Sequence, residues 1–166
     1  CDMGALAEFY PGYKKADDPA TLKYFSSAWG TDRLPPGPGL TATEMIDAAV
    51  SGDIKAMYIV GEDPANSDPC SQNVHKALDN LDFLVVQDIF MTATAQAADV
   101  VLPGAVWAEK EGSFTNTERR VQWSSQAIDP PGAALSDLEI VCKVARSLGL
   151  DFDYPDAASV LAEINR

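Results

Sequence analysis

Residues 58–69 read YIVGEDPANSDP, and this stretch decides the fold class that the sequence predicts. It closes a nearly continuous apolar run, IKAMYIV, at Gly61. Apolar runs of this length are typical of strands buried in a parallel sheet. Gly61 permits unusual backbone angles, Pro64 fixes the course of the loop, and two carboxylates lie between them. The stretch therefore predicts a buried strand that ends in a loop presenting polar groups.

Helical and strand-like segments alternate around this strand. Thr41 and Glu44 form a capping box, which predicts a helix ending at Gly52. Helical spacing over 69–81 is followed by an apolar run over 83–90. An Ala-rich helix and a strand over 100–102 come next. This order predicts an α/β fold, with a doubly wound parallel sheet covered by helices on both faces.

The two flanks of the α/β region differ from it in composition. Residues 1–40 are rich in Pro, Gly and aromatic residues, which predicts an irregular connector with one short helical stretch near 19–30. After residue 107, the alternation in GSFTNTERRVQW predicts a hairpin, and two apolar-faced helices follow near 136–149 and 156–166. The predicted division is a connector at 1–40, an α/β region at 41–106, and a hairpin with C-terminal helices at 107–166.

Composition excludes several classes of partner and site. The 166 residues carry 12 basic and 25 acidic side chains, a formal charge of −13. Nucleic acid and anionic membrane surfaces would repel such a chain, and no apolar run is long enough for a membrane span. Cys1, Cys70 and Cys142 are widely spaced and the chain has one histidine, so we expect reduced thiols without a zinc site.

Polar residues gather where the three predicted strands end. In an open α/β sheet, ligands bind beyond the carboxyl ends of the strands. A carboxylate there, such as Asp63, accepts hydrogen bonds from a ribose diol or from the N–H edge of guanine. The pattern favours a nucleotide-like ligand, although capping and turn formation explain any one of these residues better. The charged run at 109–111 is expected to face solvent.

Four longer stretches carry a resemblance to a known family. Residues 57–69, 76–122 and 129–149 closely resemble the molybdopterin oxidoreductases, and 1–13 is similar to them as well. Within that family the chain looks most like an internal piece of the catalytic α subunit of formate dehydrogenase. The resemblance covers nearly the whole chain and implies that the α/β region is a Rossmann-like dinucleotide-binding half domain.

The resemblance also implies cofactors and site residues. Family members hold molybdenum or tungsten with two molybdopterin guanine dinucleotides, oxidise formate to CO₂, and pass electrons to a [4Fe-4S] cluster outside this segment. The resemblance implies that the dinucleotide site is formed by Gly61, Glu62, Asp63 and Ser67 around the guanosine, by Gln87, Asp88, Thr92 and Gly104 as further walls, and by Asp137 near guanine. Starting a helix explains Asp137 equally well.

Residues that the family uses for catalysis are not found in this sequence. Neither the N-terminal cysteine cluster nor the metal-ligating Cys or selenocysteine with its His and Arg is present, so we assign no catalytic and no metal-binding residue. The segment is expected to be inactive alone. Its expected partners are the remaining domains of the parent subunit, electron-transfer subunits of the complex, and a second copy through faces left uncovered. The expected location is cytoplasmic, with a periplasmic parent complex as an alternative.

Other interpretations stay open at this point. A nitrate reductase or the large iron–sulfur subunit of NADH dehydrogenase would share the same segment. A non-catalytic α/β module that binds a small anion or a protein is a third interpretation, because the strand-exit loop alone has low specificity.

Overall fold

The computed structural model describes residues 6–68 and 71–165, so the predicted reduced thiols of Cys1 and Cys70 lie outside the described residues. Cys142 is described, and its thiol is free and buried. The chain forms two compact units, Cys1–Ile54 and Lys55–Arg166. The predicted three-segment division stays a prediction.

The first unit is built around a small aromatic cluster. Tyr10 stacks on Phe25 with ring centroids 5.0 Å apart, and Trp29 packs on Phe25 at 4.8 Å. The predicted short helix begins after Asp18, whose carboxylate accepts from the amide of Ala20, and it ends at Gly30 in the left-handed region. The hairpin before it was not predicted. The elements are β1 Phe9–Tyr10, β2 Lys14–Lys15, α1 Pro19–Trp29 and α2 Ala42–Ser51.

Helix α2 confirms the predicted capping box. The Glu44 carboxylate accepts from the Thr41 amide at 2.8 Å and from the Thr41 hydroxyl at 2.7 Å. The helix ends at Gly52, which has a φ of 83°. That angle lies in the left-handed region that residues with a side chain rarely adopt.

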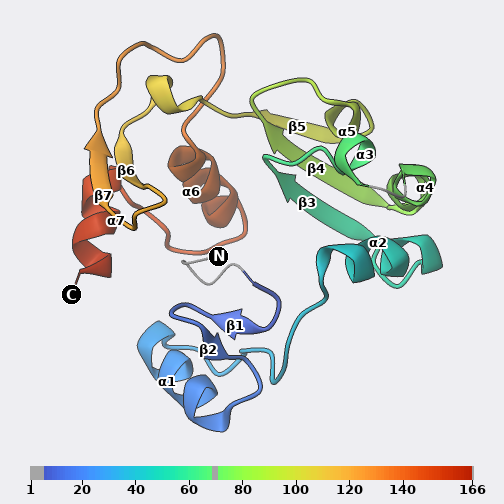
Figure 1. Cartoon of the computed structure of the whole chain (residues 1–166), viewed down its shortest axis with the longest axis horizontal. Helices are drawn as coiled ribbons and strands as arrows, with labels where there is room; N and C mark the ends of the chain where they lie inside the picture. The colour runs from blue at the N-terminus through green and yellow to red at the C-terminus, as the bar shows by residue number, and fades with distance from the viewer. Residues whose placement is uncertain (1–5, 69–70, 166) are drawn as a thin grey trace. The chain divides into compact units, whose positions relative to one another are not determined.

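The second unit contains a three-stranded parallel sheet with the order β3-β4-β5 among the described residues. Figure 1 shows this sheet, with β3 at its edge. The register aligns Val60 with Gln87, and Gln87 with Leu102, so the three strands end at the same level. The strands are β3 Ala56–Val60, β4 Phe83–Asp88 and β5 Val100–Pro103, and the connecting helices are α3 Pro64–Ser67, α4 Ser71–Asn80 and α5 Ala93–Gln96.

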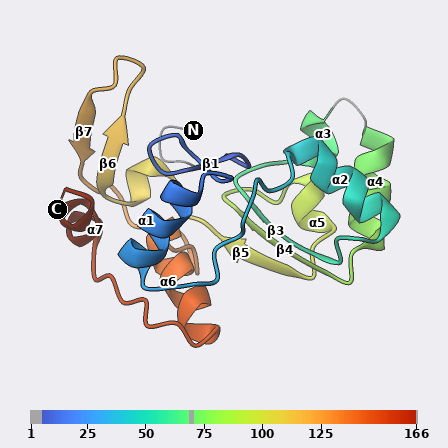
Figure 2. The same ribbon diagram turned by 90° about the horizontal axis from the view of Figure 1, so that it is seen from below.

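Helices α3, α4 and α5 pack on one face of the sheet, as the two views in Figures 1 and 2 show. This placement is expected, since right-handed crossovers between strands in sequential order leave their helices on the same side. The core therefore forms on this face. Leu84 and Val86 of β4 are buried there, as are Val74, Ala77 and Leu78 of α4. On the opposite face Tyr58, Val60 and Phe83 are exposed by 42 to 50%.

The rest of the second unit places a helix beyond the carboxyl ends of the strands (Figure 1). Helix α6 begins where the sheet's strands end, and a hydrogen bond from Gln87 to Asp137 joins the two. The predicted α/β fold class with a parallel sheet flanked by helices is thus confirmed, as are the hairpin and the two C-terminal helices. The elements are η1 Trp107–Glu109, β6 Gly112–Thr115, β7 Val121–Ser124, α6 Asp137–Ser147 and α7 Ala157–Ile164.

No helix within the described ranges has the length and apolarity that a membrane crossing requires.

Candidate functional site

The three strand exits lie side by side and are tied together through the backbone. The Gly61 amide donates to the Gln87 carbonyl at 2.9 Å, and the Gly104 amide donates to the Asp88 carbonyl at 3.0 Å. Gly61 has a φ of 64°, which a side chain would strain, so glycine allows the chain to turn sharply away from β3. These contacts place the loops after β3, β4 and β5 around one opening.

A distant segment joins these loops because it extends the sheet. Leu135 pairs with Gly104 in a parallel bridge, in which the Ala105 amide donates to the Leu135 carbonyl at 2.8 Å. Helix α6 starts two residues later, at Asp137. A side-chain oxygen of Asp137 would lie 3.8 Å from a Cβ placed at Gly104. The bridge therefore carries Asp137 to the strand exits.

A pocket of about 430 Å³ lies at this meeting point. Its volume falls in the range of sites that hold small molecules. The described lining leaves out Glu62 and Ser67, which are exposed residues in the loop and at the end of α3. Seven of the nine predicted site residues line the pocket: Gly61, Asp63, Gln87, Asp88, Thr92, Gly104 and Asp137.

Asp63 has a structural role in this arrangement. Its Oδ1 accepts from the Thr94 amide at 3.0 Å and from the Thr94 hydroxyl at 2.6 Å, and its Oδ2 accepts from the Asn66 side chain at 2.6 Å. Hydrogen bonds from Thr94 are the main reason that the pKa of Asp63 lies below its ordinary value. Asp63 therefore joins the loop after β3 to α5, and only its remaining lone pairs are available to accept from a ligand.

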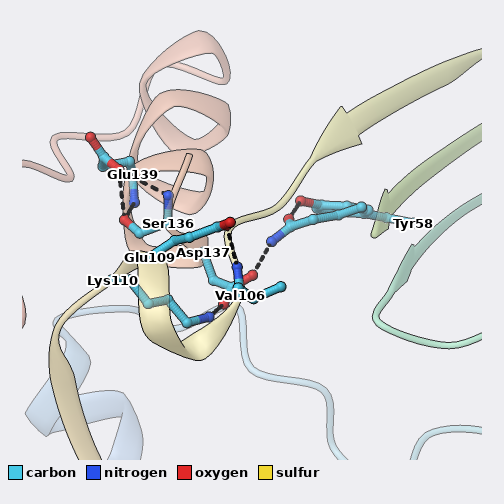
Figure 3. Close-up of polar contacts among 8 residues, drawn as sticks. Tyr58, Val106, Glu109, Lys110, Ser136, Asp137 and Glu139 are labelled. Carbon is cyan, nitrogen blue, oxygen red and sulfur yellow. Dashed lines mark hydrogen bonds and ion pairs between the residues drawn. The ribbon is translucent and has the colours of Figure 1, made fainter. Parts of the chain in front are cut away.

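Asp137 belongs to a chain of four polar side chains, shown in Figure 3. Its Oδ1 accepts from Gln87 Nε2 at 2.7 Å, and its Oδ2 contacts Lys110 Nζ. Gln87 Oε1 in turn accepts from the Tyr58 hydroxyl. Burial, and then the charge of Asp137, raise the pKa of Tyr58, so its hydroxyl stays protonated and donates.

The turn before Lys110 explains how that side chain reaches Asp137. In η1, the Val106 amide donates to the Glu109 carboxylate at 2.9 Å, which closes the turn directly before Lys110 (Figure 3). The expectation that the run at 109–111 faces solvent is wrong for Lys110, whose side chain is only 23% exposed. Its partner Asp137 is 27 residues away in the sequence, so no local pattern indicated this contact.

The charges of the lining residues indicate which part of a nucleotide fits. Asp63, Asp88 and Asp137 supply carboxylates, and Lys110 is the one basic side chain among the described lining residues. Phosphate oxygens are repelled by such a surface, whereas the N–H groups of a base and the hydroxyls of a ribose find acceptors. Apolar surface from Ile89 and Phe90, which sequence reasoning did not single out, completes the lining. A lining of this kind suits the base and ribose of a nucleotide better than its phosphates.

A larger pocket, of about 680 Å³, lies between η1, β6, α6 and α7. Of the predicted site residues, its described lining contains only Asp137. Its lining combines apolar side chains such as Leu138 and Leu161 with charged ones, and it lacks the converging strand exits, so size alone does not identify the site.

Metal-binding side chains do not cluster in the described part of the chain. Among residues 6–68 and 71–165, no group of three or more His, Cys, Asp or Glu side chains lies close enough together to hold a metal ion.

Comparison with known proteins identifies relatives along the full chain. The chain is 53% identical, over 100% of its length, to the F420-dependent formate dehydrogenase subunit alpha of Methanocaldococcus jannaschii, of which it covers 24%. It is 40% identical to formate dehydrogenase H of Escherichia coli, covering 99% of this chain and 23% of that protein. The chain thus spans about a quarter of the length of these curated relatives.

A solved structure gives the same result at the level of the fold. Acetylene hydratase from Pelobacter acetylenicus matches with a TM-score of 0.66 and 29% identity, over 75% of this chain and 18% of that one. The sequence model of the family described as molybdopterin oxidoreductase matches residues 3–147. This chain belongs to the molybdopterin oxidoreductase family.

Proposed function

We propose that this chain is part of a formate dehydrogenase α subunit and that it binds the guanosine of a molybdopterin guanine dinucleotide in the pocket at the strand exits. A molybdopterin cofactor follows from the family itself. The observation that carries the finer proposal is the meeting of seven predicted residues, from three strand exits and the start of α6, around one pocket.

Recognition of guanine follows from the chemistry of the pocket. The Watson–Crick edge of guanine presents N1–H and the 2-amino group as adjacent donors, and a carboxylate only accepts hydrogen bonds. Asp137 offers such a carboxylate, and Asp88 and the lone pairs left on Asp63 suit the ribose hydroxyls. Adenine presents no such pair of donors, so we expect the pocket to discriminate against it.

The whole protein's chemistry is proposed from its relatives. The metal centre, molybdenum or tungsten between two such dinucleotides, supplies the two-electron oxidation of formate to CO₂, with a [4Fe-4S] cluster beyond this segment as the electron acceptor. The residues of this chain hold and orient the nucleoside end. We expect the 166-residue chain to oxidise no formate by itself, because the sequence supplies none of the family's catalytic residues.

The partners, location and substrate of the whole protein are proposed from its relatives and from the sequence, and not from the structure of this chain. The names of two formate dehydrogenase relatives describe α subunits, which supports association with further subunits. Electron-transfer subunits, self-association of the segment and a cytoplasmic location stay predictions from the sequence. The acetylene hydratase relative is named for another reaction, so this segment does not by itself decide the substrate.

Calorimetric titration with GMP tests the nucleotide proposal, and Gly104 offers a matched pair of variants. A Cβ at Gly104 would lie 3.7 Å from Ile89 Cγ2 and 3.8 Å from Asp137 Oδ1, which are ordinary contact distances. We therefore expect Gly104→Ala to fold and to bind GMP nearly as the unaltered chain does. The longer side chain of Gly104→Leu would occupy the pocket, and we expect it to weaken GMP binding by about 10-fold or more.

The two variants distinguish binding of GMP in the proposed pocket from binding elsewhere. Saturable binding that Gly104→Leu removes and Gly104→Ala keeps supports the proposed pocket. Binding that is equal in both variants places the nucleotide elsewhere and contradicts the proposal, provided that circular dichroism shows both variants folded.

A further inference from the structure

The chain of Tyr58, Gln87, Asp137 and Lys110 spans β3, β4, the turn after η1 and the start of α6 (Figure 3). Gln87, Asp137 and Lys110 line the pocket at the strand exits, and Tyr58 does not. Tyr58 lies behind Gln87 and contacts the pocket through it. The array therefore extends from the pocket wall to the exposed face of the sheet, where Tyr58 lies.

The direction of each hydrogen bond in the array is fixed. The Asp137 carboxylate only accepts, so the amide nitrogen of Gln87 faces it at 2.7 Å. The amide oxygen then faces Tyr58, which donates to it. Gln87 is 1% exposed, and reversing its amide would leave buried groups without hydrogen bonds. Asp137 thus determines which way the Gln87 amide points, and the bond from the Tyr58 hydroxyl to Gln87 Oε1 holds the amide in that orientation.

Two contacts hold the Asp137 carboxylate from different directions. Gln87 binds Oδ1 and Lys110 contacts Oδ2, so the carboxylate cannot rotate freely about its side-chain bonds. The Asp137 side chain nevertheless remains 50% exposed, which leaves lone pairs for a ligand. An acceptor that is fixed before binding loses no rotational freedom when a ligand arrives, and this strengthens discrimination between ligands.

We propose that Tyr58, Gln87 and Lys110 are positioning residues, which hold the Asp137 carboxylate so that it selects a purine with two adjacent N–H donors. This inference rests on the proposed function of the pocket. Lys110 contributes by holding Oδ2 and by offsetting the negative charge of the three lining carboxylates. The base selected is guanine, since hypoxanthine lacks the 2-amino donor and adenine lacks both donors.

The test compares the affinities of the 166-residue chain for GMP, IMP and AMP, which carry the same phosphate. We expect the unaltered chain to bind GMP about 10-fold more tightly than IMP, because IMP leaves one acceptor of a charged group unpaired. Tyr58→Phe removes one hydroxyl outside the pocket, and we expect the ratio of GMP to IMP affinity to fall by about 3-fold or more. Lys110→Met should lower the same ratio, and Lys110→Arg should restore most of it.

Matched controls separate positioning from general stability. Tyr10→Phe removes an exposed hydroxyl in the first unit, and Lys143→Met removes an exposed charge on α6. Neither should change the ratio. A merely structural role for the array would lower the urea midpoint in Tyr58→Phe and leave the GMP-to-IMP ratio of the folded chain unchanged.

Each outcome decides the inference. A reduced ratio in Tyr58→Phe and Lys110→Met, with both controls unchanged, supports it. An unchanged ratio overturns the inference and leaves the proposed function intact. Equal losses for GMP, IMP and AMP in Lys110→Met assign Lys110 to the phosphate and also overturn it. If the unaltered chain binds no GMP at all, the proposed function and this inference fail together. If Tyr58→Phe does not fold, the comparison of Lys110→Met with Lys110→Arg, at a position on a surface turn, tests the inference in the same way.

Discussion

At the scale of single residues, Thr94 is the side chain whose replacement we expect to lower the free energy of unfolding most. It is completely buried, its hydroxyl donates to Asp63 Oδ1 at 2.6 Å, and that hydroxyl accepts from the Ala65 amide at 3.2 Å. Thr94→Val keeps the volume and removes both bonds, so a buried amide loses its partner. We expect the free energy of unfolding to fall by about 1–3 kcal/mol, measured by urea denaturation.

An exposed threonine supplies the control for this change. Thr115→Val on β6 replaces the same atoms at an exposed position and should change the free energy of unfolding by less than about 0.5 kcal/mol. Equal effects of the two substitutions would show that the bond between Thr94 and Asp63 contributes nothing specific.

The pKa of Asp63 predicts how stability depends on acidity. Hydrogen bonds from Thr94 hold that pKa below its ordinary value of 3.8, so the ionised form is favoured in the folded chain. The stabilisation is complete well above pH 3.8 and is lost as the pH falls below that value through the folded-state pKa. Asp63→Asn has no carboxylate to titrate at this position.

Urea midpoints measured between about pH 7 and pH 3 check this dependence. The unaltered chain should exceed Asp63→Asn in stability by the largest amount at neutral pH, and the two should converge toward acid pH. A difference that stays constant over this range would contradict the role assigned to the ionised carboxylate.

Asp63 also shows what sequence reasoning captures about a single residue. Its place at a strand exit was readable from YIVGEDP, because a strand pattern and a turn pattern meet there. Its partner Thr94 is 31 residues away, on the far side of another strand. Only the register of the sheet brings the two residues together. The sequence therefore indicated Asp63 as a ligand-binding residue, and the structure adds its hydrogen bond with Thr94.

At the scale of elements, the start of α6 determines where Asp137 lies. The Ser136 hydroxyl accepts from the Glu139 amide at 3.3 Å, and the Glu139 carboxylate accepts from the Ser136 amide at 2.9 Å. Ser136→Ala removes the cap that precedes Asp137. We expect a loss of about 1 kcal/mol in the free energy of unfolding, measured by urea denaturation.

Ser147 is a control within the same helix. Its hydroxyl donates to the Lys143 carbonyl at the other end of α6, where the residue is exposed. Ser147→Ala should be nearly neutral, because alanine is the better helix former and no cap is lost. A cost for Ser147→Ala equal to that for Ser136→Ala would contradict the capping argument.

Elements were predictable where their signals are local. The Thr41–Glu44 box, the stop at Gly52 and the apolar strands all depend on neighbouring residues, and the structure has each of them. The hairpin of β1 and β2 was not predicted, because its strands have two residues each and carry no periodicity. The same holds for η1, which a single local bond from Val106 to Glu109 closes.

At the scale of the whole molecule, the site depends on contacts between segments far apart in the sequence. The parallel order of strands predicted that their exits meet, and five lining residues follow from that rule, namely Gly61, Asp63, Gln87, Asp88 and Gly104. Thr92 and Asp137 were expected only from the resemblance to the family. The position of Lys110 could not be predicted from this rule, because a lysine between two glutamates is typical of a solvent-exposed segment. Its contact with Asp137 depends on the bridge between Gly104 and Leu135, which brings the start of α6 to the strand exits.

The most direct test of the account is a titration of the isotopically labelled chain with GMP, followed by the NMR shifts of its backbone amides. We predict that the largest changes occur at Gly61, Thr92, Gly104 and Asp137, which line the pocket at the strand exits. Ser113, Ala157 and Leu161 line the larger pocket and serve as the internal reference. Changes concentrated at the reference residues, or no changes anywhere, would contradict a guanosine site at the carboxyl ends of the strands.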